Sequence, residues 1–296
     1  MGLFKRSILV IWWTAIRPRT LSMAATPVVL GSALAWADQA APLWPVFLAT
    51  LLCALLIQIG TNLHNDVADF ERGADRPDRL GPLRVTVAGW ATPQSVHRVA
   101  ALSFALAFML GAYLVQQGGW PILAIGVASL IAGWAYLGGA HPISHSALGE
   151  VFVLVFFGML AVVGSHWLQS GNTAPAAWLS GAVVGLPAAA VLLVNNYRDR
   201  EADQRQGRHT LAARLGDRGA ERAYATMVLL PFALVLGVAW VAHPGALLSL
   251  LALPYALTLI PRLHRQASGA QLNGLLGATA KLGLWLGLLL AMGVFL

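Results

Sequence analysis

The chain has little charge and a single cysteine. Only 10% of its 296 residues are charged, whereas a typical soluble domain has about 25%. Hydrophobic residues make up 58% of the chain, and its mean hydropathy is +0.69. These values exclude an ordinary soluble domain and place the protein among helical membrane proteins. The lone Cys53 lies within an apolar run, and an internal disulfide is excluded because there is no second thiol.

The sequence also lacks any polar stretch long enough to form a separate soluble domain. Long apolar runs fill most of it instead, and about 20 apolar residues are enough to cross the ~30 Å hydrocarbon core of a membrane. Nine such spans are predicted, at roughly Thr20–Trp36, Leu43–Gly60, Val96–Val115, Trp120–Tyr136, Leu148–Leu168, Ala177–Val194, Tyr224–Ala242, Ala246–Ile260 and Leu275–Leu296. We therefore expect an all-α, polytopic membrane protein whose single domain covers residues 1–296.

Basic residues are absent from every second loop. With nine spans, all Lys and Arg residues except Lys281 fall on the side of the membrane that holds the N-terminus. Because positively charged loops stay in the cytoplasm, this asymmetry predicts a cytoplasmic N-terminus and an external C-terminus. A net charge of +7 would suggest nucleic-acid binding in a soluble protein, but here membrane topology accounts for it.

Two short acidic patches lie at the ends of apolar spans, one in each half of the chain. The patches consist of Asn62, Asp66 and Asp69 in the first and of Asn195, Asp199 and Asp203 in the second. In both, four residues separate the Asn from the first Asp, and a further Asp follows three or four residues later. Residues at these spacings share a helix face. A carboxylate at membrane depth costs roughly 2.5–3.5 kcal/mol on insertion scales, so we expect both patches to bind a ligand.

The two patches are 133 residues apart, and this interval contains four predicted spans. The offset indicates two related four-helix units, formed by spans two to five and six to nine, with span one as an extra helix. If the patches face each other across a central cavity, they can share one ligand. The alternative interpretation is that each patch is a solvated helix end or part of an internal salt bridge.

Charges of both signs occur beside the patches, because the polar segments that follow them contain Arg as well as Asp and Glu. Carboxylates hold Mg²⁺, Mg²⁺ neutralises phosphate oxygens, and Arg adds hydrogen bonds to phosphate. Two carboxylate clusters therefore predict an anionic, phosphate-bearing ligand held by more than one metal ion. Lys281 lies roughly two turns inside span nine, and it either reaches back to the membrane interface or faces the same ligand.

Several of these segments resemble the UbiA-type intramembrane prenyltransferases, and the resemblance extends over nearly the whole chain. Within that family, the chain is most similar to the branch that prenylates 1,4-dihydroxy-2-naphthoate for menaquinone. The matching segments are residues 17–21, 65–84, 148–158 and 195–216. The two Asp motifs are typical of the superfamily, while Arg79–Arg84 and Leu148–Glu150 are typical of the naphthoate branch. His145 and Ala147 depart from that branch, which commonly has Tyr and Gly at these positions.

The resemblance implies Mg²⁺-dependent transfer of a polyprenyl chain from its diphosphate to the naphthoate, with loss of carbon dioxide and formation of demethylmenaquinol. The expected catalytic residues are Asp66, Asp69, Asp199 and Asp203, which together with Asn62 and Asn195 are the expected metal ligands. The expected substrate contacts are Asn62, Asn65, Arg72, Arg84, Tyr136, His145, Asn195, Arg198, Arg208 and Lys281. Metal and arginine would neutralise the departing diphosphate, and apolar helices would shield the allylic cation from water.

Two alternatives stay open. The same chemistry could act on another aromatic acceptor, such as 4-hydroxybenzoate or homogentisate. A cation-coupled secondary transporter also combines internal repeats with intramembrane charges, although the charges here gather on one side of the membrane. By the resemblance, the partners are a polyprenyl diphosphate, the aromatic acceptor and the lipid bilayer, with no nucleic acid. The expected location is a bacterial inner membrane, with the active site on the cytoplasmic side.

Overall fold

The computed structural model describes residues 7–71, 81, 83–137, 142–205, 207–265 and 269–296. Six side chains inside helices also fall outside that description: Arg19, Asp69, Trp134, Leu137, Arg265 and Ala270. The elements are α1 (Ile8–Ile16), α2 (Pro18–Ala37), α3 (Trp44–Glu71), α4 (Pro93–Leu137), η1 (Ile143–His145), α5 (Gly149–Val153), η2 (Leu154–Met159), α6 (Leu160–Ser170), α7 (Pro175–Arg205), α8 (Leu211–Val241), η3 (Pro244–Ala252), α9 (Leu253–Arg265) and α10 (Gly269–Gly293). No strand occurs among the described residues, and the predicted all-α fold is confirmed.

Eight apolar helices in the described part of the chain are long enough to cross a membrane, against nine predicted spans. The difference lies in α4, whose 45 residues cover both the third and the fourth predicted span. A straight helix of that length would measure about 67 Å, roughly twice the hydrocarbon thickness. Gly119 interrupts α4 with φ 66° and ψ −151°, a conformation that glycine adopts readily. The protein is therefore an integral membrane protein in which α4 is long enough for two crossings.

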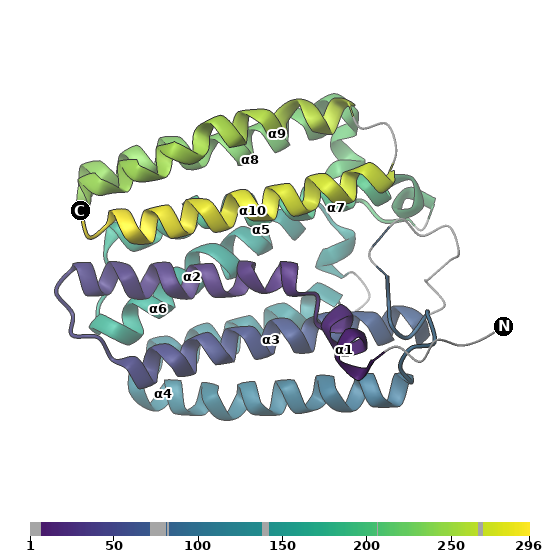
Figure 1. Cartoon of the computed structure of the whole chain (residues 1–296), viewed down its shortest axis with the longest axis horizontal. Coiled ribbons are helices and arrows are strands. Elements are labelled where there is room, and N and C mark those ends of the chain that lie inside the picture. Colours follow the sequence, from purple (N-terminus) through teal and green to yellow (C-terminus); the bar gives the residue numbers. More distant parts are fainter. Residues whose placement is uncertain (1–6, 72–80, 82, 138–141, 206, 266–268) are drawn as a thin grey trace.

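Helix α7 forms the centre of the bundle. It contacts α2, α6, α8, α10 and η2, and 72% of its most apolar segment is buried, a larger share than in any other span. Figure 1 shows α2 and α10 running side by side through the middle, with α3 and α4 on one side and α8 and α9 on the other. Leu30, Val183, Leu193, Val228 and Leu286 are among the buried side chains of the main apolar core.

Close glycine contacts hold α5, η2 and α6 against α7. The π-helix η2 joins α5 directly to α6. A Cβ atom on Gly158 would lie 2.5 Å from the carbonyl oxygen of Gly181 and from the Cα of Gly185. Glycine permits this backbone approach because it has no side chain. The contact positions the start of α5 beside the polar end of α7, and π-helical turns are frequent at functional sites.

The two ends of the bundle differ in their polar groups. The end that carries α1 also holds the C-terminal ends of α3 and α7, and with them both acidic patches (Figure 1). At the opposite end, Gln169 Oε1 accepts hydrogen bonds from Trp36 Nε1 and Leu43 N, each at 2.9 Å. His166 Nε2 lies 3.3 Å from the Asp38 carboxylate there. This network joins helix ends, whereas Arg84, Arg198 and Arg208 lie at the end of the acidic patches.

Candidate active site

Asn62 and Asp66 of the first acidic patch bind neighbouring segments of the protein. Asn62 is only 5% exposed. Its Nδ2 donates to the carbonyl oxygen of Ile16 and to Thr20 Oγ1, both at 2.9 Å, and its Oδ1 accepts from Gln58 Nε2 at 3.1 Å. Asn62 therefore ties α3 to the junction between α1 and α2.

Asp66, one turn further along α3, holds the segment that precedes α4. Its carboxylate is 1% exposed and accepts from the backbone N–H groups of Val85 at 3.0 Å and Thr86 at 3.1 Å. The Thr86 hydroxyl also donates to it. Arg84 is buried and donates from Nη1 to the carbonyl oxygen of Asn65 at 3.1 Å. Asp66 thus has three donors from the protein itself, and its binding of a metal stays a prediction.

The second acidic patch is organised around Arg198 of α7. The Arg198 side chain is 2% exposed, and it donates to the two Asp199 oxygens at 2.8 and 2.5 Å. It also donates to Asn195 Oδ1 at 2.9 Å and to Asn273 Oδ1 of α10 at 2.7 Å. The Asp199 side chain stays 34% exposed. A buried cation therefore holds a carboxylate that a ligand can still reach.

The chain beyond α7 turns back onto the same patch. Asp203 is buried and accepts from Arg208 Nη1 at 3.3 Å, and its carbonyl oxygen accepts from the Arg208 N–H at 2.9 Å. The next residue, His209, donates its N–H to the carbonyl oxygen of His145 at 2.8 Å. The structure thereby brings together six residues predicted from the sequence: His145, Asn195, Arg198, Asp199, Asp203 and Arg208.

A third polar group lies where α4 ends and α5 begins. Glu150 of α5 is 1% exposed, and its Oε1 accepts from Asn196 Nδ2 at 2.9 Å. Tyr136 packs on Phe152 with ring centroids 5.5 Å apart. An aromatic pair and a buried carboxylate therefore lie on α5 and the end of α4.

Lys281 lies on an exposed face of α10. Its Nζ is 4.7 Å from the centre of the Trp285 ring, and Tyr255 of α9 packs on the same ring at a centroid distance of 5.1 Å. The ammonium group thus makes a cation–π contact beside an aromatic pair. The contact of Lys281 with the diphosphate, expected from the sequence, stays a prediction.

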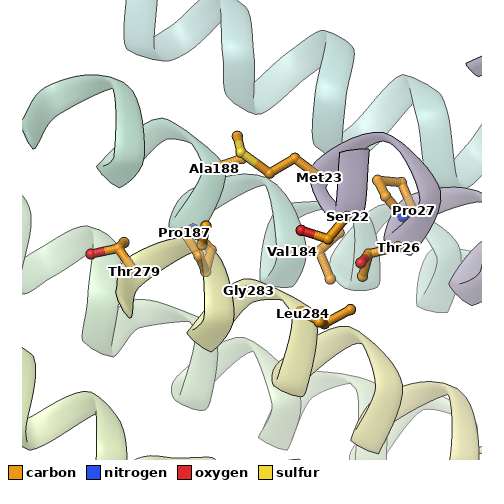
Figure 2. Close-up of a pocket in the computed structure, with 11 residues that line it drawn as sticks. Ser22, Met23, Thr26, Pro27, Val184, Pro187, Ala188, Thr279, Gly283 and Leu284 are labelled. Atoms are coloured by element: carbon orange, nitrogen blue, oxygen red, sulfur yellow. The ribbon is translucent and has the colours of Figure 1, made fainter. Parts of the chain in front are cut away.

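A small, largely apolar cavity lies where α2, α7 and α10 meet (Figure 2). It offers about 20 Å³ to the centre of a water molecule, which is room for about one. Ser22, Met23 and Thr26 line it from α2, Val184, Pro187 and Ala188 from α7, and Thr279, Gly283 and Leu284 from α10 (Figure 2). The cavity marks a loosely filled junction of the three central helices.

The donors at the polar end fit Mg²⁺ by chemistry. Carboxylate and amide oxygens are its preferred ligands, and it usually takes one or two carboxylates together with substrate phosphates and water. The exposed Asp199 carboxylate and the buried Asp203 provide such oxygens on α7. Within the described residues, no three His, Cys, Asp or Glu side chains gather closely enough to hold a metal alone. Two predicted contributors, Arg72 and the Asp69 side chain, lie outside the described residues.

Four polar residues of this region have no role in the sequence prediction: Thr86, Glu150, Asn196 and Asn273. Thr86 and Asn273 contact predicted residues from distant parts of the chain. Glu150 does carry a local signal, because it is a carboxylate at the start of a long apolar run, and intramembrane carboxylates are commonly functional. Asn196 directly follows Asn195 but points to a different partner.

Carboxylates, amides and arginines grouped at one end of an intramembrane helical bundle define a class of protein that binds anions, with or without metal, at the membrane surface. Residues 24–285 match the model of the UbiA prenyltransferase family, and the chain belongs to this family.

Similar proteins share most of the chain. The 1,4-dihydroxy-2-naphthoate octaprenyltransferase of Escherichia coli (strain K12) is 36% identical over 294 residues, covering 96% of this chain and 95% of that protein. The enzyme of the same name from Mycobacterium tuberculosis is 36% identical over 246 residues, covering 83% of both. The structure of a UbiA homolog from Archaeoglobus fulgidus bound to GPP and Mg²⁺ covers 95% of this chain and 99% of that chain, with a TM-score of 0.64 at 15% identity. That likeness establishes the shared fold.

Proposed function

We propose that this protein transfers a polyprenyl chain from a prenyl diphosphate to 1,4-dihydroxy-2-naphthoate, with loss of carbon dioxide, and so forms demethylmenaquinol. The second acidic patch carries the proposal, because it joins an accessible Asp199 carboxylate to the buried Arg198 at the end of a membrane helix. Relatives named for this reaction, which match over nearly the whole chain, support the choice of acceptor.

Diphosphate departure from an allylic carbon requires neutralisation of the charge that develops on the leaving group. We assign Mg²⁺ binding to Asn195, Asp199 and Asp203, together with Asn62, Asp66 and Asp69. Bound Mg²⁺ would supply a Lewis acid that neutralises the diphosphate oxygens.

Arginine supplies the second part of the diphosphate site. Arg198 is held by two amide oxygens and one carboxylate, so its guanidinium is preorganised and needs no rearrangement when charge develops. Arg208 is paired with Asp203 and partly exposed, which leaves some of its donors for phosphate oxygens. Arg84, which donates to the Asn65 carbonyl oxygen beside the first patch, and Arg72, which lies outside the described residues, are proposed to contact the same group.

The allylic cation must meet the acceptor ring before it meets water. Apolar side chains of α2, α7 and α10 line a cavity with room for only about one water molecule (Figure 2), so we propose that the prenyl tail runs along apolar helix faces and leaves sideways into lipid. The acceptor would approach from the side of Tyr136 and His145. Glu150 of the same region bonds Asn196 of α7, and the His145 carbonyl oxygen accepts from His209, which follows α7.

We further propose that the polar end faces the cytoplasm of a bacterium, with the N-terminus inside and the C-terminus outside. The arginines of the described loops lie at the end of the acidic patches, and basic loops stay in the cytoplasm. The test introduces Ser7→Cys or Leu296→Cys into the Cys53→Ala variant and treats intact cells with a membrane-impermeant thiol reagent. Only the Leu296→Cys variant should be labelled.

The decisive experiment measures products made by the purified protein in lipid nanodiscs. The protein is given Mg²⁺, a mixture of prenyl diphosphates and, separately, 1,4-dihydroxy-2-naphthoate, 4-hydroxybenzoate or homogentisate. We expect a prenylated, decarboxylated naphthalenediol by mass spectrometry and little product from the other acids. Turnover of another acid alone would replace the acceptor, while ion-coupled uptake into proteoliposomes without any transfer would reject the enzyme.

A further inference from the structure

The Glu150 carboxylate is only half satisfied by the described part of the protein. Oε1 accepts from Asn196 Nδ2 at 2.9 Å, whereas Oε2 is buried and has no hydrogen-bond partner among the described residues. The residue is 1% exposed and opens a membrane-spanning helix. Leaving a buried acceptor without a donor costs about 1–3 kcal/mol, and a carboxylate at membrane depth adds to that cost. A donor from outside the chain would remove the penalty.

The backbone around Glu150 keeps the carboxylate in place. Gly158 lies so close to Gly181 and Gly185 that an added Cβ would meet backbone atoms at 2.5 Å. The rigid unit of α5, η2 and α6 therefore cannot slide along α7, and Glu150 stays opposite Asn196. A functional group held this way is preorganised toward its ligand.

The surroundings of Glu150 suit a flat aromatic molecule with a hydroxyl group. The Tyr136 ring packs on Phe152, and Phe152 stacks on Phe156 at a centroid distance of 4.4 Å. A wall of rings attracts another ring by stacking. The only hydrogen-bond capacity that a free carboxylate oxygen offers is acceptance, so its ligand must supply an O–H or N–H donor.

The same group lies next to the diphosphate residues. Asn196, which binds Glu150, directly follows Asn195, which binds Arg198. An acceptor bound at Glu150 would therefore lie one residue along α7 from the groups that hold the diphosphate. This is the placement that ring prenylation needs.

We propose that Glu150 is the catalytic base for the acceptor and that its Oε2 receives the proton of the acceptor hydroxyl next to the reacting ring carbon. The inference rests on the proposed function and adds to it the residue that recognises and activates the acceptor. The substrate class is a phenol-type hydroxyl ortho to the carbon that is prenylated.

The proposed proton transfer leaves no atom or electron unaccounted for. The allylic C–O bond breaks, diphosphate keeps its electron pair, and the ring carbon that bears the carboxylate forms the new C–C bond. The adjacent hydroxyl gives its proton to Glu150 and becomes a ketone. When carbon dioxide leaves, its bonding electrons restore the aromatic ring, and the ketone oxygen takes the proton back from Glu150. No outside oxidant, reductant or proton is required.

The first test is Glu150→Gln, which preserves size and the acceptor for Asn196. We expect kcat for naphthoate prenylation to fall about 100-fold or more, the usual range for loss of a general base. Hydrolysis of the prenyl diphosphate without acceptor should stay within about twofold of wild type. Glu201→Gln, the same change at an exposed position on α7, is the matched control and should leave both rates unaltered.

The second test separates catalysis from structure by changing the ligand. Wild-type protein in nanodiscs should bind 1,4-dihydroxy-2-naphthoate about 10-fold more tightly than 4-hydroxy-2-naphthoate, which lacks the adjacent hydroxyl, and Glu150→Gln should lose most of that preference. Equal preference in both proteins, or near-normal kcat in the variant, would overturn the proposal. If Glu150→Gln does not fold, the wild-type protein decides alone, and equal affinity for the two naphthoates would overturn the proposal.

The same measurements separate failure of the proposed function from failure of the role given to Glu150. Wild-type protein that prenylates none of the aromatic acids refutes the proposed function and the inference with it. Wild-type protein that prenylates the naphthoate, with Glu150→Gln equally active, refutes the inference alone.

Discussion

The two acidic patches have the same Asn-to-Asp spacing and lie at the same end of the bundle, yet their side chains are used differently. In the first, Asp66 is 1% exposed and its donors come from a segment 19 and 20 residues further along the chain. In the second, the Asp199 side chain is 34% exposed and its partner is the adjacent Arg198. Asp66 of the first patch binds another segment of the chain, whereas Asp199 of the second patch keeps its carboxylate partly exposed.

This difference shows that a repeated motif need not contribute equally to stability and chemistry. A buried carboxylate with three donors stabilises the segment that it holds. The partly exposed Asp199 carboxylate neutralises the buried Arg198 and can also be reached by a ligand. Substitutions at the two aspartates should therefore separate the two roles.

The largest effect is expected for Asp199→Ala. Transfer activity should fall about 1000-fold, because the variant loses the accessible carboxylate proposed to bind the metal. The protein should still fold, with a melting temperature a few degrees lower, because the buried Arg198 loses its carboxylate but keeps the amide oxygens of Asn195 and Asn273. Activity is measured in membranes with excess Mg²⁺ and donor, and melting by size-exclusion of a fluorescent fusion. Asp217→Ala, at another carboxylate paired with an arginine, is the control; full activity of Asp199→Ala would contradict the site.

Asp66→Ala should reduce activity and also destabilise the protein. Removing a buried carboxylate with three donors costs about 3 kcal/mol, and a chain of this size should melt at least 5 °C lower. The fluorescent fusion measures both yield and melting temperature. A variant that melts like wild type would show that the hydrogen bonds of Asp66 to Val85 and Thr86 do not stabilise the protein. The two patches would then not differ in their contribution to stability.

Arg198→Lys tests whether the arginine of the second patch acts by geometry or by charge alone. A lysine cannot reproduce the forked contacts to Asp199, Asn195 and Asn273. We expect about a 10- to 100-fold loss of kcat/KM for the prenyl diphosphate in steady-state assays. Arg200→Lys, at the neighbouring arginine paired with Asp217, should change it by less than about threefold; equal losses in both would argue for charge alone.

Thr86→Val makes the smallest change at the first patch. It removes one hydroxyl donor from Asp66 while both backbone donors stay. The expected cost is about 1 kcal/mol, seen as a melting temperature about 2–4 °C lower, with transfer within about twofold of wild type. Thr50→Val removes a hydroxyl bonded only within α3 and should cost less. A stronger loss of activity than of stability would move Thr86 into the chemistry.

Lys281→Met should have the weakest effect. Its ammonium group lies on an exposed face of α10, over Trp285, and loss of one exposed cation–π contact costs about 0.5–1 kcal/mol. We expect KM for the prenyl diphosphate to stay within about threefold. A tenfold rise would instead support the diphosphate contact expected from the sequence.

Much of the architecture can be predicted from the sequence. The helical membrane fold follows from run length and composition, which are local properties. The count of spans differs at α4, which is one element although Gly119, with its non-helical φ and ψ, lies where the sequence predicts the break between the third and fourth spans. The sequence also predicts the candidate metal ligands of each patch, because residues four positions apart lie on one helix face.

The sequence by itself therefore determined the membrane class, the side of the bundle on which the charges gather, and the residue types available for a metal-bound anion. Only the tertiary structure decided what each side chain does. Asp66 meets Thr86, Glu150 meets Asn196 and Arg198 meets Asn273 across 20, 46 and 75 residues. Such partners depend on how helices pack and how closely glycines let them approach, and neither spacing nor composition encodes that in any one segment.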